Sequence, residues 1–323
     1  MKNKDIIFIT SKDDEHTDYM IEYFNKNLPT ISVIRLNTED FATNCYISFN
    51  GNKVIIEILD SGKTIDSENV HTVVYRRPKK ITTEHIEDKY TQEFILKQFN
   101  AFLKGFYFCT HDSALWINPL PSLHRAKIKF QQLKLAKELK FNTPNTMVSN
   151  KKDNVIDFIE NNNTVCMKSL DTPSFVTDNY IYPLYTKIVE KTYVMNHLDN
   201  IEVSPILLQE YIEKKYDIRV VIIGKKLFSF EIHSQENNDS IVDFRVAILD
   251  IVYKEHILPK EIEDKIFTFV KKQKLYYSSM DLVLTPNDEY YFIENNPNGQ
   301  WLWLELETDI DITSHYCNFL INH

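Results

Sequence analysis

The sequence predicts a protein of the α/β (α+β) class, in which a small α/β domain precedes a larger, strand-rich part. Strand and helix patterns alternate first, the pattern breaks at Asn118-Pro119-Leu120-Pro121, and paired strands dominate from about residue 204. We therefore expect three domains, which cover residues 1–120, 121–203 and 204–323.

Apolar runs and helical spacing assign the elements of the first domain in turn. Asp5–Thr10 is a short apolar run typical of a buried strand, and Thr17–Asn27 has helical spacing. Asn50-Gly51-Asn52 separates two strand-like segments and predicts a hairpin. Thr83–Leu103 is a long amphipathic segment and predicts a helix. The other strands expected in this domain are Ile31–Leu36, Asn44–Phe49, Lys53–Ile58 and Val70–Tyr75.

The remaining elements follow from the same signals. A cationic helix is expected from about Ser122 to Lys140, ending before Pro144. Gly224-Lys225 and Thr285-Pro286-Asn287-Asp288 are typical of tight turns that join two strands. We further expect helices at Val155–Glu160, Pro259–Gln273 and Asp309–Ile321, and strands at Thr164–Ser169, Ile206–Ile212, Ile218–Ile223, Leu227–His233, Tyr276–Leu284 and Tyr290–Asn295.

Glycine is scarce in this chain. It contains 5 glycines in 323 residues, whereas an average usage of about 7% would give about 23. No two of them have the spacing of G-x-G-x-x-G or of G-x-x-x-x-G-K-[ST], so a Rossmann fingerprint and a Walker A loop are both excluded. A nucleotide bound by this chain would have to be held largely by side chains.

Charge and cysteine usage exclude other classes. The net charge of −9 disfavours a nucleic-acid binder, which needs a basic face. No run of 18 apolar residues occurs, so no membrane span is expected. The four cysteines are scattered without a C-x-x-C pair, which indicates free thiols in a reducing compartment and a cytoplasmic protein.

An oxygen-rich cluster is predicted where two strands pair near the C-terminus. Glu294 and Asn296 are two residues apart at a strand end and therefore face the same side. Asp281 lies on the preceding strand, and hairpin pairing should bring it beside Glu294. Two carboxylates and an amide oxygen form a set that Mg²⁺ prefers. A polar strand end followed by the turn-forming Asn296-Pro297-Asn298-Gly299 is the alternative, and spacing alone does not decide between them.

Two lysines and a strand-rich stretch complete the candidate residues. Lys168 ends an apolar strand, where burial of a lysine calls for an anionic partner such as phosphate. Lys129 lies on the cationic helix, where most lysines are simply solvated. Asp217 and Arg219 share a strand face, but a surface ion pair worth ~0–1 kcal/mol would explain them equally well.

In combination these residues resemble a known family. Lys129, Lys168, the Gln209-Glu210-Tyr211-Ile212 stretch, Asp217-Ile218-Arg219, Asp281 and Glu294-Asn295-Asn296 follow the order and spacing of the ATP-grasp ligases. More closely, the chain resembles the graspetide synthetases, the microviridin-type macrocyclases of ribosomal peptides. Further stretches that support this are Val74–Pro78, His233-Ser234-Gln235, Asp243-Phe244-Arg245 and Asn296–Glu305.

The resemblance implies a fold and a set of roles. It implies an ATP-grasp fold preceded by a small pre-ATP-grasp α/β domain. For ATP, it implies that Lys129 and Lys168 bind the phosphates, that a hinge at Gln209, Glu210, Tyr211 and Ile212 binds adenine, that the ribose lies near Asp217, and that Asn296 contacts the nucleotide. It implies that Asp281, Glu294 and Asn296 bind Mg²⁺. It also implies that Lys168, Arg219 and Arg245 are catalytic and stabilise charge.

The substrate implied by the resemblance is a ribosomal precursor peptide with a leader, whose Asp or Glu side chains would be phosphorylated and then joined to Thr, Ser or Lys. Arg76, Arg77 and Arg245 are candidates for binding acidic side chains. For Arg76-Arg77, a solvated strand end is the alternative. Trp301 and Trp303 fit core or dimer packing better than substrate contact. A homodimer is also expected from the resemblance.

Two features leave the function open. Many ATP-grasp enzymes have a glycine-rich loop after the second lysine, and residues 170–177 contain no glycine; we expect a flexible lid instead. The same residues also fit another ATP-grasp ligase that adds amino acids to a protein or small molecule. A module that binds nucleotide or peptide without turnover is the third hypothesis.

Overall fold

A parallel sheet forms the core of the N-terminal domain. The computed structural model describes residues 5–171, 174–177, 180–248 and 250–322. The strands lie in the order β2-β1-β6-β7, all parallel. Their bounds are Asp5–Thr10 (β1), Val33–Asn37 (β2), Val70–Tyr75 (β6) and Leu115–Ile117 (β7). Except for the short β7, these strands confirm the apolar runs predicted from the sequence.

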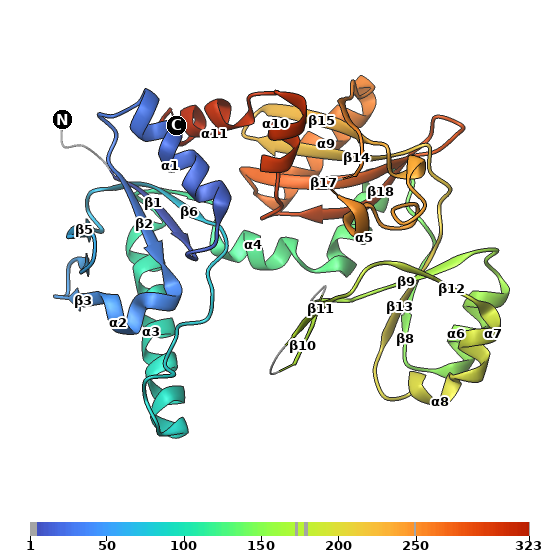
Figure 1. Cartoon of the computed structure of the whole chain (residues 1–323), viewed down its shortest axis with the longest axis horizontal. Coiled ribbons are helices and arrows are strands. Elements are labelled where there is room, and N and C mark those ends of the chain that lie inside the picture. Colours follow the sequence, from blue (N-terminus) through green and yellow to red (C-terminus); the bar gives the residue numbers. More distant parts are fainter. Residues whose placement is uncertain (1–4, 172–173, 178–179, 249, 323) are drawn as a thin grey trace.

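The same domain carries a small antiparallel sheet and a long helix. Strands β3 (Cys45–Phe49), β4 (Val54–Ile58) and β5 (Lys63–Asp66) pair in that order, so the hairpin predicted at Asn50–Asn52 is confirmed. Helix α3 (Lys89–Thr110) begins and ends later than predicted. It begins at Lys89 because Asp88 caps it by accepting a hydrogen bond from Thr91 N. It projects from the domain in Figure 1. No helix in the described ranges is both long and apolar enough to cross a membrane. The domain's other helices are α1 (Glu15–Asn27), η1 (Thr38–Asp40) and α2 (Phe41–Asn44).

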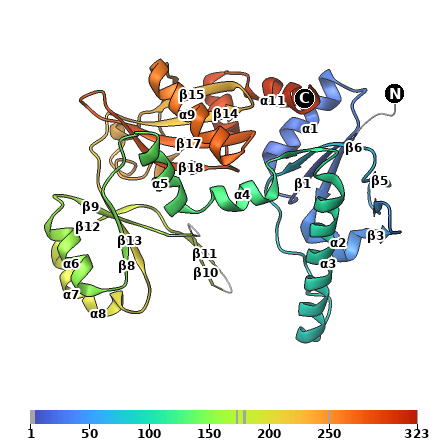
Figure 2. The ribbon, with the colours of Figure 1, turned by 180° about the vertical axis from the view of Figure 1, so that it is seen from behind.

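A second, antiparallel sheet lies in the middle of the chain. Its strand order is β12-β9-β13-β8, and a separate hairpin of β10 and β11 precedes β12. Helices α6, α7 and α8 lie together beside this sheet in Figures 1 and 2. The bounds are Thr146–Ser149 (β8), Val165–Lys168 (β9), Ser174–Val176 (β10), Ile181–Pro183 (β11), Lys187–Val189 (β12), Ile206–Glu210 (β13), Lys152–Glu160 (α6), Lys191–Asn196 (α7) and Leu198–Ile201 (α8).

A third sheet of five antiparallel strands follows. Its order is β16-β15-β14-β17-β18, and it contains both predicted hairpins. Apolar side chains of α9 pack with those of β14, β17 and β18 in one core. The bounds are Tyr216–Ile223 (β14), Lys226–Ile232 (β15), Tyr253–Glu255 (β16), Tyr277–Leu284 (β17), Tyr290–Asn296 (β18), Ser234–Glu236 (η2), Phe244–Ala247 (η3) and Lys260–Gln273 (α9).

The single helix expected over Ser122–Lys140 is wrong, because the chain forms two helices there. Helix α4 (Leu120–Ala126) ends before Ile128, whose backbone is extended, and α5 (Lys129–Glu138) begins after it. The amide of Gln132 donates to Ala126 O at 2.7 Å. This side-chain bond satisfies a carbonyl that a continuous helix would have used.

The last helix of the chain packs against elements of the N-terminal domain. Helix α11 (Ile312–Ile321) confirms the terminal helix predicted over Asp309–Ile321, whereas α10 (Leu302–Thr308) was not predicted. Helix α11 lies beside α1 in Figures 1 and 2. Apolar residues of β1 and α1 share a core with residues of β14, β15 and α11. The N-terminal domain is therefore attached to the five-stranded sheet through buried apolar surface.

Candidate active site

Three charged side chains lie in a row across the five-stranded sheet. Arg219 on β14 is the register partner of Asp281 on β17, and Asp281 is the partner of Glu294 on β18. The register shifts between Asp281 and Leu282, which marks a bulge next to this row. The predicted position of Asp281 beside Glu294 is confirmed.

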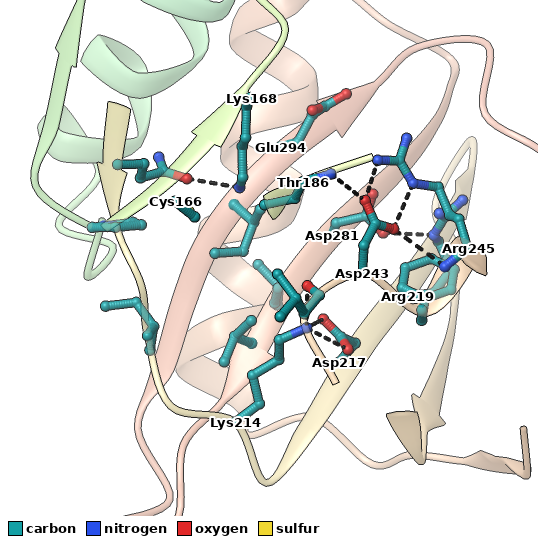
Figure 3. Close-up of a pocket in the computed structure, with 18 of the residues that line it drawn as sticks. Cys166, Lys168, Thr186, Lys214, Asp217, Arg219, Asp243, Arg245, Asp281 and Glu294 are labelled. Carbon is teal, nitrogen blue, oxygen red and sulfur yellow. Dashed lines mark hydrogen bonds and ion pairs between the residues drawn. The ribbon is translucent and has the colours of Figure 1, made fainter. Parts of the chain in front are cut away.

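The row faces a cleft of about 280 Å³. Figure 3 shows Lys168, from the central sheet, on the same cleft as Asp281 and Glu294 of the five-stranded sheet. Of the residues predicted for the site, eleven line this cleft: Lys168, Gln209, Glu210, Tyr211, Ile212, Asp217, Arg219, Arg245, Asp281, Glu294 and Asn296. Lys129 lines a small adjoining pocket together with Lys168 and Glu294.

Asp281 is an ionisable group in a desolvated position. Burial raises the pKa of its carboxyl, the nearby charge of Glu294 raises it further, and the guanidinium of Arg219 only partly opposes this. Arg219 Nε lies 2.6 Å from Asp281 Oδ1. The Cζ atom of Arg219 lies 5.7 Å from the ring centroid of Phe244 and 5.9 Å from that of Trp303. An additional cation beside Asp281 would therefore be favourable.

Glu294 is held in its ionised form by two lysines. Burial acts to raise its pKa, but the positive charges of Lys129 and Lys168 outweigh it and leave the pKa below the ordinary value. Lys129 Nζ donates to Glu294 Oε2 at 2.7 Å. Lys129 is thus not a solvated helix lysine, although its contact here is with a carboxylate.

Asp281, Glu294 and Asn296 suit a hard divalent cation. All three offer oxygen, from two carboxylates and one amide, and the first two are adjacent by register. No group of three or more His, Cys, Asp or Glu side chains in the described part of the chain could hold a metal ion. The candidate set differs from such a group because its third member is an amide. Magnesium binding by these residues stays a prediction.

Lys168 points into the cleft from the end of β9. Its Nζ donates to Gln209 Oε1 at 2.7 Å, and it forms no ion pair with any residue that the structure describes. Burial is the main cause that lowers its pKa, and the nearby positive charges of Lys129 and Lys214 add to the effect. A half-buried ammonium group whose hydrogen-bond partner is a neutral amide is suited to an incoming anion.

The predicted hinge runs along the rim of the cleft where β13 ends. Glu210 N donates to Asn145 O at 2.8 Å, and Tyr211 N donates to Thr164 O at 2.9 Å. The Glu210 carboxylate accepts from Asn145 N at 3.2 Å. These bonds tie the hinge to the central sheet, and the adenine contact predicted for it stays a prediction.

Two residues beside the predicted site were given no role from the sequence, although one of them, Asp243, lies in a stretch that supports the resemblance. Lys214 is buried and donates to both carboxylate oxygens of Asp217 at 3.0 Å. Asp243 accepts from Arg245 Nε and from Thr186 N, both at 2.8 Å. No sequence pattern distinguishes Lys214 from the adjacent Lys215, which is the same residue type and is exposed.

The Asp243 pair fixes the second arginine of the site. The hydrogen bonds to Asp243 raise the pKa of Arg245, which therefore stays charged. Burial alone would raise the pKa of Asp243, but Arg245 outweighs burial and lowers it. Because Thr186 follows the β10–β11 hairpin, Asp243 also links that segment to the wall of the cleft.

Arg76 and Arg77 lie outside the main cleft and differ from each other. Arg76 is buried, and its Nε lies 3.0 Å from both oxygens of Asp14. It is therefore not a solvated strand end, and its guanidinium is already paired within the protein. Arg77 is exposed and lines a second cleft. Trp301 is fully buried in the core, whereas Trp303 lines the main cleft.

Comparison with known families agrees with this geometry. The family model described as "RimK-like ATP-grasp domain" matches residues 125–320. The chain belongs to the RimK-like ATP-grasp family. A second family model, described as "MvdD pre-ATP grasp domain", matches residues 5–124. The ATP-grasp fold with an N-terminal pre-ATP-grasp domain, and the resemblance to ATP-grasp ligases of ribosomal peptides, are thereby confirmed.

Solved structures resemble this ATP-grasp protein over nearly its whole length. One of them is a RiPP-associated ATP-grasp ligase of Chryseobacterium gregarium, solved in complex with ADP and a leader and core peptide. It is 26% identical in sequence with a TM-score of 0.89, and the match covers 99% of this chain and 97% of that chain. The macrocyclase MdnC of Microcystis aeruginosa MRC, bound with precursor peptide MdnA, is 25% identical with a TM-score of 0.85, covering 99% and 100%. No protein with a curated description matches this chain.

Proposed function

We propose that this ATP-grasp protein is a ligase that closes macrocyclic links in a ribosomal precursor peptide. Its substrate groups are Asp or Glu side chains, which it activates with ATP and joins to Thr or Ser as an ω-ester or to Lys as an ω-amide. The observation that carries the proposal is the Arg219–Asp281–Glu294 row, which faces Lys168 across one cleft. The likeness to a RiPP-associated ligase and a peptide macrocyclase supports the choice of a peptide substrate.

ATP occupies the main cleft in this proposal. Its adenine lies against Gln209, Glu210, Tyr211 and Ile212, and its ribose lies near Asp217. Its phosphates meet Lys129, Lys168 and Asn296. The domains of residues 121–203 and 204–323 supply the two walls of this cleft, and none of the described residues of the N-terminal domain, residues 1–120, lines it.

Asp281, Glu294 and Asn296 would hold Mg²⁺. When bound, the ion would neutralise charge on the phosphates of ATP. Arg219 and Arg245 add fixed positive charge on the same cleft, so that negative charge developing on the transferred phosphoryl group is stabilised by groups already in place.

The proposed reaction has two steps. A side-chain carboxylate oxygen of the peptide attacks the γ-phosphorus of ATP, the bond from that phosphorus to ADP breaks, and an acyl phosphate forms. A hydroxyl or amine of the same peptide then attacks the acyl carbon, its proton is released, and phosphate departs with the carboxylate oxygen. Each ring therefore removes one water from the peptide and produces one ADP and one phosphate.

Water must be excluded while the acyl phosphate exists. The lid expected after Lys168 overlaps residues 172–173, which lie outside the described residues. The described part of this segment forms the hairpin of β10 and β11. The link from Thr186 N to Asp243, just after this hairpin, supports a closing role for the segment.

Several partners belong to the proposal. The peptide carries a leader, the protein acts as a homodimer, and the reaction takes place in the cytoplasm with Mg²⁺-ATP.

Incubation of the protein with Mg²⁺-ATP and a co-encoded precursor tests the proposal by mass spectrometry. The peptide should lose one water mass per ring, with one ADP formed per ring. The Asp281→Asn and Glu294→Gln variants should lose at least about 100-fold in rate, because developing charge is no longer neutralised. A gain in peptide mass would instead identify a ligase that adds amino acids, and binding without ADP formation would identify a module without turnover.

A further inference from the structure

A second cleft, of about 420 Å³, lies between the N-terminal domain and helix α4. The residues after β6 form one wall, α4 forms another, and Asn296 and Asn298 form the end. Asn296 also lines the main cleft. The two clefts therefore meet at the end of β18, next to the predicted metal ligands.

The second cleft is cationic in a chain of net charge −9. Arg76, Arg77, Lys79 and Lys127 line it, and Asp13 is the one carboxylate among its lining residues, since the partner of Arg76 is Asp14. Lys79 pairs with Asp13 at 2.8 Å, which neutralises that carboxylate. Arg77 and Lys127 are exposed and form no ion pair with another described residue. Among the residues that the structure describes, these two positive charges, one just after β6 and one at the end of α4, are thus left without an ion-pair partner.

The wall that carries Arg77 is fixed relative to the end of β18. Asn298 Nδ2 donates to Arg76 O at 2.8 Å, so the residue before Arg77 is bonded to the segment that follows Asn296. The buried pair of Arg76 with Asp14 holds the same backbone in place. Arg77 is therefore held at a set position beside the end of β18 rather than on an independent loop.

We infer that this second cleft binds an acidic side chain of the precursor peptide, separate from the carboxylate being activated. The inference rests on the proposed function. Because both clefts reach Asn296, a peptide that presents one carboxylate in the main cleft can extend into the second cleft, where Arg77 and Lys127 are unpaired. A carboxylate fits them because a guanidinium can bind both of its oxygens and Lys127 adds a point charge.

A charge-neutral double variant tests the inference, with a matched control on α5. Arg77→Gln with Lys127→Gln should raise both the dissociation constant and the KM of the precursor by about tenfold, because two exposed charge pairs with the bound carboxylate are lost. Lys134→Gln with Lys137→Gln removes two exposed lysines that do not line the cleft, and both constants should stay as in the parent protein. Precursors with single Glu→Gln or Asp→Asn changes locate the bound carboxylate, because one of them should lose affinity for the parent protein and not for the double variant.

The outcomes separate this inference from the proposed function. Tenfold weaker precursor binding in the double variant supports the cleft, even if the parent protein binds the peptide without removing water, which would refute only the proposed function. Unchanged binding in the double variant, an equal loss in the control, or a loss that is the same for every precursor variant would overturn the inference. Competition by inorganic phosphate at the concentration of the peptide would also overturn it, because the cleft would then be a phosphate site.

Discussion

At the scale of single residues, His16 joins the N-terminal domain to the segment that follows the predicted metal ligands. Its Nε2 accepts from Trp301 N and Leu302 N, both at 3.0 Å, where α10 begins. This nitrogen must be unprotonated to accept both bonds. Burial, followed by the charge of Arg76, lowers the pKa of His16 to about 3, although Asp14 acts in the opposite direction.

The lowered pKa of His16 predicts a dependence of stability on pH. Because the folded pKa lies below the unfolded value of about 6.5, its contribution is complete above about pH 6.5 and is lost as pH falls toward about 3. The His16→Gln variant keeps a side-chain acceptor that does not titrate. Between about pH 7.5 and about pH 5.5, the free energy of unfolding should fall by about 1 kcal/mol more for the parent protein than for the variant. Denaturant unfolding at both pH values measures this difference. An equal fall in the free energy of unfolding for the parent protein and the variant would show that His16 is not buried as a neutral acceptor.

The lysines of the site show what residue patterns can and cannot predict. Lys168 was predicted because it ends an apolar strand, a place where charge requires a partner. Lys214 lies in a charged link beside another lysine, and only the fold decides that Lys214 is buried against Asp217 while Lys215 pairs with Asp288 at the surface. Gln132 was missed for the same reason, because its bonds to the backbone of Asn295 depend on a contact between distant segments.

At the scale of elements, local signals were sufficient where a turn sets the register. The Thr285–Asp288 turn predicts that β17 pairs with β18 and sets their register as far as Leu282. The bulge between Asp281 and Leu282 then shifts the register by one residue, and this shift places Asp281 opposite Glu294. The break between α4 and α5 could not be predicted, because it depends on Gln132 bonding to both Ala126 and Asn295. Strands as short as β10, β11 and β12 contain too few residues to show a period of two.

Two glycines predict opposite effects of the same substitution. Gly105 lies inside α3, and a methyl group there would meet no atom within 4 Å. Gly105→Ala should raise the free energy of unfolding by about 0.5–1 kcal/mol, because glycine is a poor helix former.

Gly224 has a φ of +59°, and a methyl group there would lie 2.5 Å from the Phe319 ring. Gly224→Ala should therefore destabilise the protein by more than about 1 kcal/mol; thermal unfolding of both variants checks this, and a stabilising Gly224→Ala would contradict the turn described for β14 and β15.

At the scale of the whole molecule, the cleft is assembled from parts that are far apart in sequence. Lys168 comes from the central sheet, the charged row comes from the five-stranded sheet, and the N-terminal domain packs on the latter through a shared core. The order of motifs along the chain predicted this ATP-grasp arrangement through resemblance. The second cleft could not be predicted in the same way, because it exists only where α4, β6 and the end of β18 meet.

The central claim is that one cleft uses ATP to activate a peptide carboxylate. A precursor whose Asp and Glu carboxylates carry oxygen-18 tests this most directly, with the isotope followed into the phosphate released by the parent protein. An acyl phosphate requires that one carboxylate oxygen leave with phosphate, so one labelled oxygen should appear in phosphate for each ring closed. Ring closure with unlabelled phosphate would contradict the account, because the carboxylate would then have been activated without transfer of the phosphoryl group to it.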